Sequence, residues 1–91
     1  MAKTRVDLSV APSPATLKHF LFVDGLLVPT AQGKGHTEID AGDHILQWTT
    51  FGSPGDSISI EGTAGGQKVI DVKSSKIPNP PPGQGHRRFK V

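Results

Sequence analysis

The sequence predicts an all-β fold: a small sandwich of six or seven short antiparallel strands, followed by a disordered C-terminal tail. Apolar and polar residues alternate along most of the chain, which is typical of strands with one buried face. Turn residues recur at intervals of about 8–12 residues, as in sandwiches and small barrels. With 11 glycines and 8 prolines in 91 residues, the composition favours short strands over long helices.

The first strand is predicted at Arg5–Val10, and the clearest alternation is that of Ile58 and Ile60 with their polar neighbours. Asp24-Gly25 is a hairpin signal, whereas the polar stretch Thr30–Gly35 is expected to be a mobile loop. The other strands are predicted at 17–24, 26–28, 37–40, 43–51 and 68–73. Alternation assigns to the interior Val6, Leu8, Leu21, Val23, Leu46, Trp48, Ile58, Ile60, Ile70 and Val72.

Phe20 and Phe22 are predicted to face away from this interior, because Leu21 and Val23 occupy the opposite side of the same strand. Paired aromatic side chains exposed on a small protein usually mark a contact surface. We therefore expect them to bind another protein, or a second copy of this chain in a homo-oligomer.

A change in composition divides the chain into a sandwich domain at 1–75 and a proline-rich basic tail at 76–91. Residues 1–75 carry six Lys or Arg against eight Asp or Glu, a net charge of −2, whereas residues 76–91 carry four cations and no acid. The tail residues His86, Arg87, Arg88 and Lys90 form a candidate site for anions. Nucleic acid is thus an alternative partner, ranked below protein.

The residue inventory favours a non-enzymatic protein without a cofactor. There is no cysteine, which excludes disulfides and thiolate chemistry, and no Gly-x-Ser-x-Gly or phosphate-binding loop motif is present. No segment reaches the roughly 18 apolar residues of a membrane span, so no membrane partner is expected. The N-terminal residues do not resemble a signal peptide, and a cytoplasmic location is the default expectation.

His36, Glu38 and Asp40 are the weak candidates for a metal site, because alternate residues of a strand share one face. Imidazole and carboxylate groups so placed are possible ligands of a divalent ion, and a cupin-like metal-binding protein is the third reading of the sequence. The favoured interpretation is a solvated strand face with Ile39 pointing inward.

Two segments within about residues 20–62 carry a family resemblance. Phe22-Val23-Asp24-Gly25 followed by Ala41-Gly42-Asp43-His44-Ile45-Leu46 resembles the PEGA family of small bacterial surface β-sandwich domains, although the Pro-Glu-Gly-Ala run is missing. Gly52–Gly62 is similar to the turn-and-strand segment of immunoglobulin-like IPT domains. The resemblance implies a small immunoglobulin-like sandwich acting as a binding or spacer domain, with no catalytic residues to assign.

Overall fold

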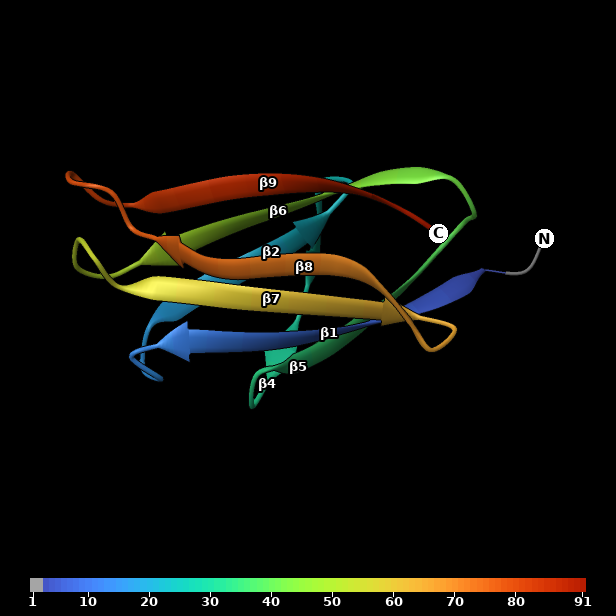
Figure 1. Ribbon diagram of the computed structural model, residues 1–91, viewed down its shortest axis with the longest axis horizontal. Helices are drawn as coiled ribbons and strands as arrows, with labels where there is room; N and C mark the ends of the chain where they lie inside the picture. The colour runs from blue at the N-terminus through green and yellow to red at the C-terminus, as the bar shows by residue number, and fades with distance from the viewer. Residues whose placement is uncertain (1–2) are drawn as a thin grey trace.

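The computed structural model describes residues 3–91, which form nine strands in two antiparallel sheets (Figure 1). The five-stranded sheet has the order β4-β5-β1-β7-β8, and the four-stranded sheet has the order β3-β2-β6-β9. Between residues 3 and 91 there is no helix long and apolar enough to cross a membrane. The strands are β1 Thr4–Ser13, β2 Lys18–Val23, β3 Leu26–Val28, β4 Thr30–Ala31, β5 Lys34–Ile39, β6 Asp43–Phe51, β7 Ser57–Ala64, β8 Gln67–Lys76 and β9 Gly83–Lys90.

The inner faces of the two sheets form one hydrophobic core. Every interior position predicted by alternation is buried, and Val6, Leu46 and Ile60 are fully shielded from solvent. The all-β architecture predicted from the sequence is therefore confirmed. The core also contains Val10, Leu17, Val28, Ile39, Ile77 and Phe89.

The segment Thr30–Gly35 is a tight hairpin between β4 and β5, so the expectation of a mobile loop there is wrong. Its central residues Gln32 and Gly33 have φ values of 55° and 77°, the left-handed conformation that two-residue hairpin turns need. The backbone N–H of Val10 donates to the carbonyl of Gly33 over 2.7 Å. This contact fastens the hairpin to β1.

The expected disordered tail at 76–91 is not found either. Residues Gly83–Lys90 form β9, which pairs with β6 along its whole length. Ile77 and Phe89 are buried in the core at 3% and 5% exposure, and the N–H of Ile77 donates to the carbonyl of Asp56. The predicted boundary at residue 75 falls inside β8, and the segment after it completes the four-stranded sheet.

Candidate functional site

The outer side of the four-stranded sheet carries the exposed aromatic side chains. Phe20 is 46% exposed and Phe22 is half-buried, while Leu21 and Val23 between and beyond them are buried. Alternation along β2 thus places both rings away from the core, as the sequence predicts. The partner role of these two residues does not follow from their orientation alone.

Neighbouring strands extend this surface. Phe51, at the end of β6, is 49% exposed, and its ring meets that of Phe20 edge-to-face with centroids 6.0 Å apart. Leu27, which lies opposite Phe22 on β3, is 53% exposed. We call these four side chains the apolar face. The sequence predicts a strand at 43–51 but not its register with β2, so it did not indicate that Phe51 lies beside Phe20.

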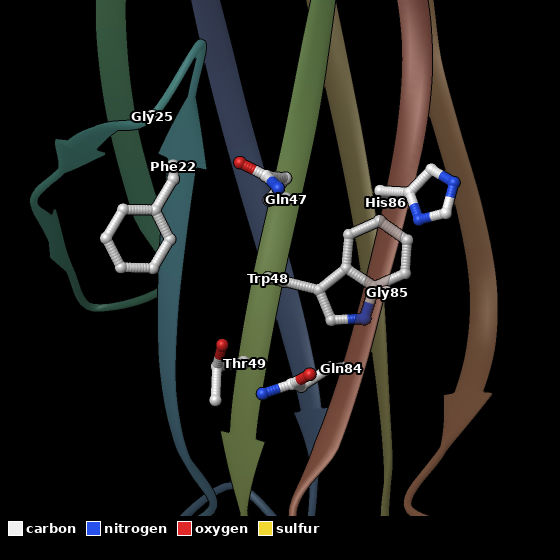
Figure 2. Close-up of a pocket in the computed structure, with 8 residues that line it drawn as sticks. All are labelled: Phe22, Gly25, Gln47, Trp48, Thr49, Gln84, Gly85 and His86. Carbon is white, nitrogen blue, oxygen red and sulfur yellow. The ribbon is translucent and has the colours of Figure 1, made fainter.

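A hollow of about 570 Å³ lies beside Phe22 on this sheet. Figure 2 shows its lining on three adjacent strands, with the Trp48 indole alongside β9 at Gly85. The polar groups of the lining are the side chains of two glutamines, a threonine, a tryptophan and a histidine, which can form hydrogen bonds with a partner. The lining residues are Phe22, Gly25, Gln47, Trp48, Thr49, Gln84, Gly85 and His86.

His44 and Asp24 form the most connected polar group of the four-stranded sheet. His44 Nδ1 bonds to one carboxylate oxygen of Asp24, and His44 Nε2 bonds to the carbonyl of Asp40 over 2.7 Å. The other carboxylate oxygen of Asp24 accepts the N–H of Ile45. Since Asp24 forms the β2–β3 turn with Gly25, the imidazole ties this turn to the start of β6.

Charge stabilises this arrangement. The hydrogen bond with His44 lowers the pKa of the Asp24 carboxyl, and the hydrogen bonds with Asp24 and with the Asp40 carbonyl raise the pKa of His44. A neutral imidazole has only one N–H, whereas both partners of His44 are acceptors. The protonated ring satisfies both. Because both nitrogens are occupied, His44 has no free position for general-base chemistry.

The metal candidates His36, Glu38 and Asp40 are all exposed. His36 lies opposite Asp7 and Glu38 lies opposite Arg5 in the pairing of β5 with β1. Within residues 3–91 no group of three or more His, Asp or Glu side chains is arranged to hold a metal ion. The geometry does not bring these three residues together with a further ligand.

The basic residues of the segment that the sequence predicts to be a tail are distributed over β9. His86 lines the hollow on the four-stranded sheet, whereas Arg87 Nη1 donates to the carbonyl of Asp71 on β8 over 3.3 Å. Arg88 lies opposite Ile45, and Lys90 lies opposite Asp43. Arg87 and Arg88 share a hollow of about 380 Å³ with Lys68 of β8, a neighbour that the sequence did not indicate.

Comparison of the chain with protein-family models, with curated protein sequences and with solved structures gives no match.

Proposed function

We propose that this protein is a non-enzymatic, immunoglobulin-like interaction module that binds another protein through the apolar face. The observation that carries the proposal is the distribution of phenylalanine. Of the four phenylalanines in the chain, Phe20, Phe22 and Phe51 lie on one outer surface and only Phe89 is in the core. Isolated exposed apolar residues are common on proteins, but several aromatic side chains on one outer surface, two of them in contact, are typical of a contact surface.

The immunoglobulin-like part of the proposal is supported by the chain path and by the two turns that resemble the PEGA pattern. The chain crosses repeatedly between two antiparallel sheets, as in sandwich domains. The Val-Asp-Gly turn and the later Gly-x-His turn contact each other directly through Asp24 and His44. One feature departs from a sandwich in which consecutive strands pair. β6 and β9 are neighbours in the four-stranded sheet, but the β7–β8 hairpin, which lies between them in the sequence, belongs to the other sheet.

Charges around the apolar face suit a different protein with acidic groups around an apolar centre. Lys18 lies at one end of the sheet, and at the other end Arg88 shares a hollow with Asp43 and with the His44-bound Asp24. Acidic groups of the partner would pair with Lys18 and Arg88. Burying a phenylalanine side chain contributes up to about 1.5–3 kcal/mol, less here because the rings are already partly covered.

The test uses a double variant, Phe20→Ser with Phe22→Ser, and a matched polar control, Asp7→Ser with His36→Ser on the other sheet. Candidate partners are obtained by photo-crosslinking from position 20 and are then purified and titrated by calorimetry. We expect the phenylalanine variant to keep its melting transition and to lose at least about tenfold in affinity, because one aromatic anchor contributes about 1–2 kcal/mol. The control is expected to bind as the wild type does.

Two results would contradict the proposal. If the double variant unfolds while the control is stable, the rings belong to the core. If a purified partner binds both variants equally, the contact lies elsewhere. If light scattering detects a dimer that the phenylalanine variant does not form, the apolar face is still the binding surface, but its partner is a second copy of this chain.

A further inference from the structure

The edges of the two sheets meet along one side of the molecule. β8 is the last strand of the five-stranded sheet and β9 is the last strand of the four-stranded sheet, and they lie side by side, joined by the hydrogen bond from Arg87 to Asp71. We call the six cationic side chains on these two strands the basic edge; three of them, Lys68, Arg87 and Arg88, line one hollow where β8 and β9 meet. The six side chains are Lys68, Lys73, Lys76, Arg87, Arg88 and Lys90.

The charge of the protein is divided sharply at this edge. β8 and β9 carry six Lys or Arg and a single carboxylate, Asp71, a net charge of +5, while the rest of the chain carries four Lys or Arg and seven acids, a net charge of −3. Asp71 lies 3.8 Å from Lys73, and Lys68 lies 3.5 Å from Glu61 of β7. Four of the six cations therefore lie without a carboxylate within 4 Å among the described residues.

The basic edge has no apolar anchor. Within residues 3–91 the exposed large hydrophobic side chains are on β2, β3 and β6, and the one aromatic ring of β9, that of Phe89, is 5% exposed. A protein interface needs a desolvated apolar centre, and attachment to a membrane usually adds an inserted apolar group. Binding of single-stranded nucleic acid relies on exposed rings that stack with bases. None of these features is present on β8 or β9.

We propose that the basic edge binds the phosphate backbone of duplex nucleic acid, without reading the bases. Lys68 to Lys76 spans about 26 Å of extended strand, which is long enough to follow several successive phosphates. Arg87 and Arg88 are carried by a strand paired with β6, so their positions are set before binding, unlike those in a flexible tail. Arg88 borders both the basic edge and the hollow beside Asp24 and His44, whereas Lys68 and Arg87 belong to the basic edge alone.

The test measures fluorescence anisotropy of a labelled DNA duplex of about 20 base pairs between about 50 and 200 mM salt. The edge variant is Lys68→Gln, Lys76→Gln and Arg87→Gln, which leaves Arg88 unchanged. The control, Lys3→Gln, Arg5→Gln and Lys34→Gln, removes the same charge away from β8 and β9, from β5, from the central strand β1 and from the residue before β1. Circular dichroism melting checks that both variants are folded.

We expect log K for the wild type to fall with log salt with a slope of about −4 to −5, since each neutralised phosphate contributes about −0.9. The edge variant should lose at least about tenfold in affinity at low salt and reduce the slope by about 3, whereas the control should change the affinity by less than about threefold. Equal losses in the two variants would overturn the proposal, because net charge alone would then explain binding. Stronger binding to anionic vesicles, to heparin or to single-stranded DNA than to the duplex would also overturn it.

Discussion

Both sheets bury apolar side chains on their inner faces, but the outer face of one sheet is polar and that of the other carries exposed apolar side chains. On the five-stranded sheet, the outward residues of β1 meet polar groups on both sides: Asp7 lies opposite His36 and Thr63, and Ser9 lies opposite Lys34 and Glu61. On the four-stranded sheet, the corresponding positions include the apolar face.

Alternation therefore determines which side of a strand is buried, whereas the residue types on the other side determine whether the outer surface is polar or apolar. Substitutions on either outer face should change the free energy of unfolding less than substitutions in the core.

The largest effect is expected from removing β9. Deletion of residues 83–91 takes away Phe89 and the strand that covers Trp48, and we expect the cooperative melting transition to be lost. Phe89→Ala alone should reduce the free energy of unfolding by about 3–5 kcal/mol, a large part of the total of roughly 5–15 kcal/mol for a small domain.

Arg88→Ala, on the outward side of the same strand, is the control and should change stability by less than about 0.5 kcal/mol. Denaturant unfolding followed by Trp48 fluorescence measures all three variants. If the truncated chain melted within a couple of degrees of the full chain, β9 would not be part of the sheet.

A smaller effect is expected from pH through the Asp24–His44 pair of the four-stranded sheet. His44 has a raised pKa, so its contribution to stability is complete below the ordinary histidine value of 6.5 and is lost as the pH rises through the raised pKa. Asp24 has a lowered pKa, so its contribution is lost only as the pH falls below the ordinary value of 3.8 and through the lowered pKa. The pair should stabilise the β2–β3 turn most between these limits.

Urea unfolding at mildly acidic and mildly alkaline pH measures this effect. The wild type should lose stability on the alkaline side relative to His44→Gln, by at most about 1 kcal/mol, since the pair is partly exposed. Gln84→Ala changes an exposed side chain of the same sheet that does not titrate and should keep the wild-type pH dependence. A wild-type curve parallel to that of His44→Gln would show that the Asp24–His44 contact contributes nothing.

The smallest effect is expected on the outer face of the five-stranded sheet. Single alanine substitutions of His36, Glu38 and Asp40 should each change the free energy of unfolding by less than about 0.5 kcal/mol, because these side chains are exposed. Elemental analysis after dialysis is the second measurement. Stoichiometric zinc, manganese or iron that disappears in His36→Ala would restore the metal-binding interpretation.

Sequence reasoning succeeded where alternation was complete. Val6 and Leu8 of β1, and Ile58 and Ile60 of β7, are separated by polar residues, and all four are buried. The outward direction of Phe20 and Phe22 follows from the same rule, whereas the difference in their exposure does not. For the candidate site, this predicted the direction of two rings but not their neighbours Leu27 and Phe51, because cross-strand register depends on pairing between distant segments.

The same reasoning failed for β9 because its inward positions carry almost no hydrophobic signal. Gly83, Gly85, Arg87 and Phe89 occupy one side of the strand, and only the last of these is a large apolar residue. The space that side chains would fill is taken instead by Trp48, whose ring lies against Gly85. A run of glycine and arginine after three prolines is typical of a disordered tail unless the tryptophan opposite is known.

The contact between Gly85 and Trp48 also restricts the register in which β9 can pair with β6. A Cβ atom at position 85 would collide with Cζ2 and Cε2 of the indole, and one at position 83 would collide with the Thr50 hydroxyl. A slip of β9 by one residue would bring Gln84 or His86 to the indole, where no side chain fits. The pairing of the last strand is thus held by two glycines that leave room for the side chains of β6, and not by apolar residues of its own.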